Sequence, residues 1–182
     1  DTSTNDSVIA FANGMAGNEV LTKEHKDYHV FKDALMFVCK HLATQIVKDG
    51  EGATKFLAVN VLNAKTKDDA KKIAKSIIGS SLVKTAFFGE DANWGRVLCA
   101  AGYSGVDFDP NIVTLSFKSV KGEIELYKDG IALEFDEDKA LEILQQVEIK
   151  IDINMNCGKE KATAWGCDLS YEYVKINGEY RS

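Results

Sequence analysis

The feature that most constrains the fold of this chain is a nine-residue alternation of apolar and polar side chains centred on residue 151. Its apolar positions are Val147, Ile149, Ile151, Ile153 and Met155. Successive side chains of a β-strand point to opposite faces, so the pattern predicts a strand with one buried face. Such a strand belongs to a layered fold, in which the buried face packs against other elements.

Four segments show helix signals instead. Between residues 31 and 48 one helix face carries the apolar side chains Phe31, Ala34, Leu35, Val38, Leu42 and Ile46. Asp49-Gly50 ends this helix, and we expect Gly50 to adopt the left-handed conformation. The other helices are predicted at residues 66–79, 94–101 and 136–146. Thr66 and Asn93 serve as expected N-caps, and acidic residues crowd the start of the last helix.

Further strands are predicted at residues 55–62, at 112–117 and 124–127 as a hairpin, and in a last strand-rich segment at 163–176. The order strand–helix–strand, then hairpin–helix–strand, indicates an α/β fold (α+β layered) with mixed sheets packed against helices. A boundary near residues 105–110 would divide the chain into a first lobe, residues 1–105, and a second lobe, residues 106–182.

Charge and composition exclude several classes of protein. The 182 residues carry a net charge of −6 and have a pI near 5.1, whereas nucleic-acid binding needs a basic surface. No apolar run has the length of a membrane span and no signal peptide opens the chain, so we expect a cytoplasmic protein. Cys39 and Cys99 lie in apolar helix patterns and are predicted to be buried thiols in a reducing compartment.

The most informative local motif is the stretch at residues 48–55, Lys-Asp-Gly-Glu-Gly-Ala-Thr-Lys, where a helix pattern stops and a strand pattern begins. Glycines at such a turn permit positive φ and the close approach of a ligand or of another backbone. They leave Glu51 projecting from a corner with few other side chains. An exposed acid just after a helix C-terminus is disfavoured by the helix dipole, so structural and ligand-binding roles for Glu51 are about equally favoured.

Other groupings of reactive side chains have simpler explanations. His25 and His29 have a metal-like spacing, but no third His or Cys lies nearby, so solvated surface histidines are expected and no metal site. Cys39 and His41 lie two positions apart on a helix and face away from each other. The Gly-Tyr-Ser-Gly sequence at residues 102–105 lacks the spacing and the preceding strand of a nucleophile elbow.

The segment at residues 89–96 is dense in polar groups and leaves two interpretations open. In the structural one, Asn93 caps the following helix and Arg96 pairs with Glu90 or Asp91. In the other, these side chains contact a substrate directly.

Three stretches together resemble one enzyme family. They are residues 48–55, residues 88–96 (Phe-Gly-Glu-Asp-Ala-Asn-Trp-Gly-Arg) and residues 173–182 (Tyr-Val-Lys-Ile-Asn-Gly-Glu-Tyr-Arg-Ser). With them, nearly the whole chain is similar to the C-terminal β chain of ornithine acetyltransferase, the bifunctional glutamate N-acetyltransferase of arginine biosynthesis. The resemblance implies the N-terminal-nucleophile architecture of the DmpA-like type.

The resemblance also implies an activity and a set of site residues. Family members transfer an acetyl group from N-acetylornithine to glutamate through an acetyl-threonine, after the precursor cuts itself into α and β chains. Glu51 matches the family's acid of the D-G-E-G motif, and Asn177 and Ser182 match its C-terminal substrate contacts. The last position is usually threonine in the family and is serine here.

The nucleophilic threonine of the family has no counterpart in this sequence. It would lie in a preceding part of the β chain with a Thr-Met-Leu-type opening, and neither Thr2 nor Thr4 is assigned its role. The implied partners are the α chain of the same precursor and that preceding part, in an α2β2 or larger assembly. No cofactor is expected, although acetyl-CoA is a candidate co-substrate. The alternatives are a self-processing aminopeptidase or amidase subunit and a non-catalytic amino-acid-binding subunit.

Overall fold

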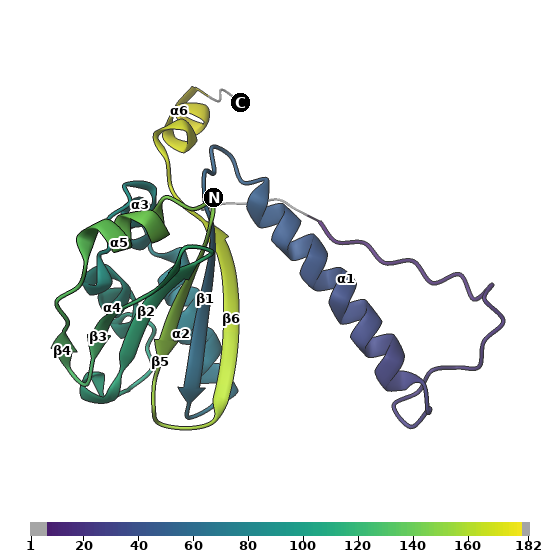
Figure 1. Ribbon diagram of the computed structural model, residues 1–182. Helices are drawn as coiled ribbons and strands as arrows, with labels where there is room; N and C mark the ends of the chain where they lie inside the picture. Colours follow the sequence, from purple (N-terminus) through teal and green to yellow (C-terminus); the bar gives the residue numbers. More distant parts are fainter. Residues whose placement is uncertain (1–6, 180–182) are drawn as a thin grey trace.

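The structure is a computed structural model that describes residues 7–179 (Figure 1). Its centre is a single six-stranded sheet in the order β4-β3-β2-β5-β1-β6. The strands are β1 (Phe56–Ala64), β2 (Thr114–Ser119), β3 (Gly122–Lys128), β4 (Ile131–Ala132), β5 (Glu148–Asn154) and β6 (Glu160–Cys167). Only β1 and β5 pair in parallel, and the other neighbours are antiparallel. The predicted mixed α/β fold is confirmed.

Six α-helices accompany the sheet within the described range. They are α1 (Tyr28–Lys48), α2 (Lys67–Gly79), α3 (Ser81–Phe88), α4 (Trp94–Gly102), α5 (Glu137–Leu144) and α6 (Tyr171–Glu179), with a short 3-10 helix, η1 (Pro110–Ile112). The side chains of Thr66, Asn93 and Asp136 accept hydrogen bonds from backbone amides in the first turns of α2, α4 and α5. These caps satisfy amides that have no partner within the helix, which explains why each helix begins where it does.

The core lies between one face of the sheet and the helices. Alternate residues of β5, at 149, 151 and 153, are fully buried, as the alternation predicted. The same core contains the buried face of α2 and the rings of Phe87 and Phe117, which are tilted against each other with centroids 4.9 Å apart. Burying apolar surface at about 25 cal/mol per Å² makes this region the stable part of the molecule.

The alternate positions of the same strands are polar and form a ladder across the sheet. Thr163 Oγ donates to Asn60 Oδ1 at 2.8 Å, and Asn60 Nδ2 donates to Asp152 Oδ1 at 2.7 Å. Lys118 Nζ continues the ladder, 2.9 Å from Asp152 and 3.0 Å from Glu123. This face therefore presents paired polar groups rather than an apolar surface.

The strands of the first and second predicted lobes meet in this one sheet. β1, from residues 1–105, lies between β5 and β6, from residues 106–182. The boundary between two lobes near residues 105–110 stays a prediction. Strands from both sides of that boundary belong to the same sheet.

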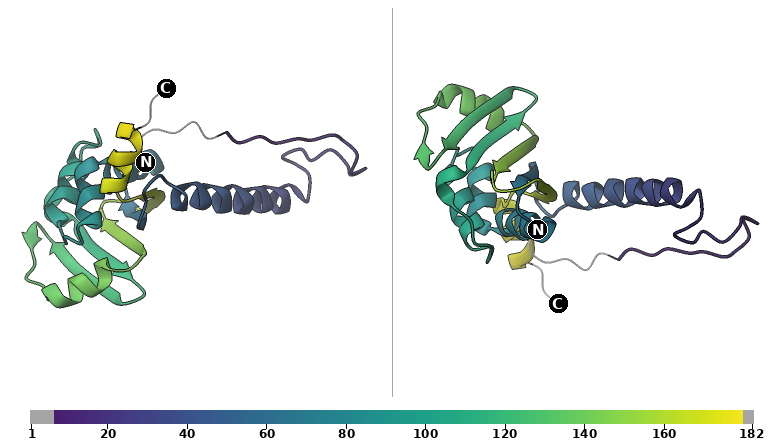
Figure 2. Two further views of the ribbon diagram at one scale, coloured as in Figure 1. Left: turned by 90° about the horizontal axis from the view of Figure 1, so that it is seen from above. Right: turned by 90° about the horizontal axis from the view of Figure 1, so that it is seen from below.

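Helix α1 stands apart from this core. It reaches away from the sheet, and the extended segment before it runs back alongside (Figures 1 and 2). None of its 21 residues is buried.

Several expectations about local structure were wrong. Residues 171–176 are helical, in α6, and not part of a strand, because β6 ends at Cys167. Helix α3 was not foreseen. Cys39 and Cys99 are exposed, whereas Cys167 is buried, since α1 has no covering layer and Cys99 lies on the outer side of α4.

No helix among residues 7–179 combines the length and the apolar character that crossing a membrane requires.

Candidate functional site

The Glu51 turn connects the end of α1 to the beginning of β1. Gly52 has a φ of +66°, whereas Gly50 is not in the left-handed region, so the glycine expected in that conformation was misplaced by two residues. The amide of Ala53 donates to the carbonyl of Gly50 at 2.9 Å and closes the turn. A positive φ costs little only at glycine, which explains this residue at position 52.

Gly52 is also required by the close approach of α6. A Cβ added there would lie 2.6 Å from the backbone nitrogen of Tyr173 and 2.9 Å from the hydroxyl of Ser170. That hydroxyl donates to the carbonyl of Gly52 at 2.6 Å and accepts from the Tyr173 amide at 3.3 Å. Ser170 thus caps the start of α6 and fastens the helix to the turn.

The contact between turn and helix brings two predicted site residues together. Asn177 Nδ2 donates to Glu51 Oε2 at 2.8 Å and to the carbonyl of Tyr173 at 3.0 Å. Both side chains are exposed, so the pair lies at the surface, accessible to a ligand. Ser182, the third predicted site residue, lies outside the described residues.

A buried carboxylate holds the strand side of the turn. Asp168, 2% exposed, accepts hydrogen bonds from the amides of Thr54 and Lys55 at 2.8 and 2.9 Å, and from the Thr54 hydroxyl. Hydrogen bonds to a charged acceptor contribute more than neutral ones, about 1.5–3 kcal/mol each. The backbone on the C-terminal side of Glu51 is therefore fixed from β6.

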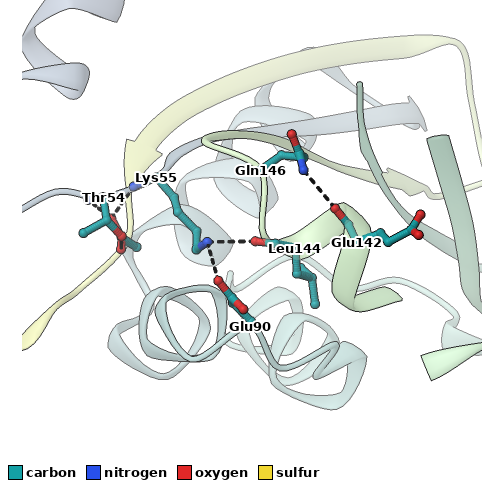
Figure 3. Close-up of polar contacts among 7 residues, drawn as sticks. Thr54, Lys55, Glu90, Glu142, Leu144 and Gln146 are labelled. Carbon is teal, nitrogen blue, oxygen red and sulfur yellow. Dashed lines mark hydrogen bonds and ion pairs between the residues drawn. The ribbon is translucent and has the colours of Figure 1, made fainter. Parts of the chain in front are cut away.

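Lys55 secures the same strand from the other side (Figure 3). Its Nζ is buried and donates to the carbonyl of Leu144 at 2.8 Å, and it pairs with Glu90 Oε1 at 3.2 Å. Leu144 closes α5, whose last carbonyls have no partner within the helix, so a cation is favoured there. Glu90, with a φ of +57°, is held in an unusual conformation for a non-glycine residue.

Beneath the turn, the Cys167 sulfur lies 3.0 Å from the position of a Cβ on Gly50. Lys84 Nζ, 2% exposed, donates to this sulfur at 3.7 Å. The turn is thus packed tightly on its inner side and open only at Glu51.

The other candidate groupings behave largely as structural elements. Asn93 caps α4 as expected, but Arg96 does not pair with Glu90 or Asp91. It donates instead to the carbonyl of Leu82 at 3.1 Å, because α3 brings that carbonyl within reach. His25 pairs with Glu19 at 3.2 Å, and residues 7–179 contain no cluster of side chains suited to a metal ion.

Sequence reasoning did not identify Asp168 and Ser170. A signal for Ser170 was present in the sequence. Serine is a common N-cap, and Asn177-Gly178 is a common helix end, so the two together indicate a helix between them. Asp168 had no local signal, since its partners lie more than a hundred residues earlier in the sequence.

The site consists of the Glu51 carboxylate, which accepts a hydrogen bond from the Asn177 amide and lies on a turn fixed by hydrogen bonds. Glu51 Oε1 has no hydrogen-bond partner among the described residues, so it can accept from a cationic ligand. A carboxylate oxygen of this kind is chemically suited to accept hydrogen bonds from an ammonium group.

The fold and this site define an α/β protein with an exposed carboxylate–amide pair, Glu51 and Asn177, at a tight turn. The chain matches the model of the ArgJ family over residues 1–182. It therefore belongs to the ArgJ family.

The individual relatives agree. The chain is 54% identical over its whole length to the arginine biosynthesis bifunctional protein ArgJ of Caldanaerobacter subterraneus subsp. tengcongensis, and it covers 45% of that protein. The corresponding protein of Thermotoga neapolitana is 51% identical and is covered to 46%. The chain thus spans less than half the length of these relatives.

A solved structure resembles the whole arrangement. The crystal structure of arginine biosynthesis bifunctional protein argJ from Bacillus halodurans is 44% identical, with a TM-score of 0.89. The alignment covers 99% of this chain and 83% of that one.

Proposed function

We propose that this chain is part of an acyltransferase that moves an acetyl group from N2-acetyl-L-ornithine to L-glutamate in arginine biosynthesis. The observation that carries the proposal is the contact between Glu51 and Asn177, in a member of a family whose relatives are named arginine biosynthesis bifunctional proteins. The two residues lie 126 positions apart in sequence and meet at one corner.

In this proposal Glu51 binds the cationic side-chain amine of acetylornithine through Oε1, while Asn177 holds Oε2. The Ser182 hydroxyl supplies a further polar contact. The nucleophile is a threonine hydroxyl from a preceding segment, with its own α-amine as the base. It attacks the acetyl carbonyl, ornithine leaves with a proton on its amine, and glutamate's amine then takes the acetyl group from the ester. Donors on the partner chain stabilise the oxyanion.

The proposal requires partner polypeptide. We propose an α chain of the same precursor and the preceding part of the β chain, in an α2β2 or larger assembly in the cytoplasm. The coverage supports a divided family: full-length relatives are covered to 45%, whereas the Bacillus halodurans crystal chain is covered to 83%. That crystal chain is therefore itself much shorter than the full-length relatives.

The direct test is ornithine release by the complete enzyme from N-acetylornithine, with and without glutamate. A transferase releases far more ornithine when glutamate is present, and an acetylated threonine peptide appears by mass spectrometry. Equal release in both samples would instead identify an aminopeptidase or amidase that uses water. No acetyl-enzyme and no release would leave an amino-acid-binding subunit. Acetyl-CoA is tested in parallel as a second donor to glutamate.

Glu51→Gln tests the site itself. Loss of one charge-assisted hydrogen bond, about 1.5–3 kcal/mol, should lower kcat/KM for acetylornithine by roughly 10- to 100-fold. Asp49→Asn is the matched control, since that carboxylate is exposed and two residues away. Wild-type kinetics for Glu51→Gln would remove this residue from the site. Deleting Arg181 and Ser182 tests the tail, and an unaltered KM for both substrates would make it merely structural.

A further inference from the structure

Helix α1 carries large apolar side chains on more than one of its faces, and the structure buries none of them. Phe31 is 51% exposed and Phe37 is 73% exposed. No residue from 7 to 48 is buried. The contrast with α2 is direct, because four of the 13 residues of α2 are buried against the sheet.

The apolar residues of α1 do not form a single stripe. At 100° per residue, Phe31, Leu35, Val38 and Leu42 share one face, Val30 and Phe37 lie about a quarter-turn to one side, and Met36 and Val47 lie toward the back. Lys40 and Asp33 lie in a polar strip between Met36 and Phe37, and further polar residues, such as Lys32 and His41, separate the other apolar groups. A surface helix typically has one apolar stripe, whereas α1 also has Val30, Phe37 and Met36 outside its main stripe.

Among the described residues, the ion pair that joins α1 to the sheet lies at the C-terminal end of the helix. Lys48 Nζ lies 2.6 Å from Glu148 Oε1, and the same ammonium lies 5.3 Å from the centroid of the Phe56 ring. The remainder extends away from the sheet along a length of about 31 Å, at 1.5 Å per residue (Figure 2). The alignment to the Bacillus halodurans crystal chain covers 99% of this chain, so it includes this protruding helix.

We propose that α1 is the docking element of this chain and that it is enclosed by the companion polypeptide, the part of the family's length that the chain does not span. This inference rests on the two-chain assembly proposed above. More than half of the length of the relatives lies outside this chain, which is enough polypeptide to surround a helix of this length. Interfaces between permanently associated chains resemble a domain core cut in half, and α1 has the composition of such a core.

A second copy of the chain fits the same helix less well. Two symmetry-related helices cover one stripe of each other, the narrow seam of a coiled coil. A seam on the face of Phe31 and Leu42 would leave Phe37, Val30 and Met36 exposed, and a seam on the side of Phe37 would still leave Met36 exposed. Enclosure by several elements of a different polypeptide covers them all.

The consequence reaches the candidate site. Helix α1 ends at Lys48, three residues before Glu51, so a polypeptide that encloses α1 arrives beside the Glu51 turn. Binding of the companion chain to α1 and completion of the candidate site then occur together. The companion chain covers the helix and delivers its own groups to the open side of Glu51.

The test compares the chain alone with the chain co-expressed with its companion polypeptide, by hydrogen exchange. Amides of α1 should exchange rapidly in the chain alone and at least 100-fold more slowly in the complex. Amides of β1 and β5 should be protected in both samples. If α1 remained unprotected in the complex, or if the chain alone formed a stable dimer that protected α1 equally well, the proposal would be overturned.

Point variants make the test specific. Val38→Asp and Leu42→Asp place a charge on the widest apolar face and should lower recovery of the companion at least tenfold. Lys40→Asp, on the polar strip, is the matched control and should leave recovery unchanged. Because protection of β1 and β5 reports folding of the chain, a folded Val38→Asp chain that bound the companion normally would refute the proposal. Companion recovery is measured without any substrate, so this outcome is separate from whether the assembly transfers acetyl groups.

Discussion

The region from residue 7 to 48 and the region from residue 49 to 179 use similar side chains with opposite results. In the second region, apolar helix faces close against a sheet, and Ile73, Ile77 and Phe87 are almost completely buried. In the first region, a longer and more uniformly apolar helix buries nothing. The difference lies in what surrounds each helix and not in the residues that compose it.

Apolar periodicity therefore predicts a helix with a face that favours burial, but it does not predict which element or chain covers that face. The sheet supplies the covering surface for α2, because β1 and β6 lie directly under it. No described element supplies one for the body of α1. The Glu51 turn lies at the junction of the two regions. Hydrogen bonds with Asp168 and Ser170 hold it to the second region.

The largest expected effect separates the two regions by stability. Phe87→Ala removes a ring that packs against Phe117 in the core and should lower the free energy of unfolding of the chain by about 3–5 kcal/mol. Leu35→Ala on α1 should change it by no more than about 0.5 kcal/mol. Urea unfolding followed by circular dichroism gives both values. A cost for Leu35→Ala close to that of Phe87→Ala would mean that α1 is already packed within this chain.

A second prediction concerns the anchor of the turn. Asp168→Asn replaces a buried acceptor of two amides and one hydroxyl with a group that must also donate, so unfolding should become easier by about 1.5–3 kcal/mol. In the complete enzyme the KM for acetylornithine should rise more than kcat falls, because the Glu51 turn loses its fixed position. Asp138→Asn, an exposed acid in the first turn of α5, is the control for a change of charge alone.

If Asp168→Asn left KM unchanged while lowering stability, Asp168 would hold β1 to β6 without positioning Glu51. If it changed neither, the two amides would find other acceptors, and the turn would be fixed by Ser170 and Gly52.

The fold could be predicted well wherever the signal was local. The caps at Thr66 and Asn93 and the alternation in β5 were read correctly because each depends on neighbours within a few residues. The error at residues 171–176 arose because α6 contains β-branched and aromatic side chains, which are typical of strands. The N-cap hydrogen bond at Ser170 favours a helix instead.

The sequence named residues of the candidate site but not the side chains that support the turn. Glu51 and Asn177 were identified from the glycine-flanked turn and from the resemblance, and the structure places them in contact. Asp168 and Lys84 gave no signal, since a buried charge acquires its meaning only from partners brought together by folding. Cys39 was expected to be buried because it lies in an apolar helix pattern, but no described element covers it.

A third prediction sharpens the junction between the regions. Gly52→Ala puts a side chain at a φ of +66° and 2.6 Å from the Tyr173 nitrogen, so it should cost about 1–2 kcal/mol and displace α6. The Asn177–Glu51 contact should be lost, which nuclear magnetic resonance of the Asn177 side-chain amide would detect. Gly178→Ala, also in α6 but facing open space, should be neutral or slightly stabilising. An unmoved Asn177 signal in Gly52→Ala would show that α6 tolerates the added methyl group.

The smallest expected effect lies on the polar face of the sheet, far from the junction. Hydrogen bonds to Asp152 and then to Glu123 raise the pKa of Lys118 above its ordinary value of 10.5. A lysine whose pKa is raised by folding contributes stability that is fully present below pH 10.5 and is lost as the pH rises through the folded-state pKa. Wild-type stability should therefore fall in this alkaline range more steeply than that of Lys118→Gln.

Lys150→Gln, a neighbouring lysine of the same face, is the matched control and should keep the wild-type alkaline slope. Because Lys118 is partly solvated, the difference should stay within about 1 kcal/mol. Urea unfolding at pH 9, 10 and 11 measures it. Parallel slopes for wild type and Lys118→Gln would show that the ladder across β6, β1, β5, β2 and β3 is screened by water. The second region would then owe its stability to its buried apolar face, which α1 lacks among the described residues.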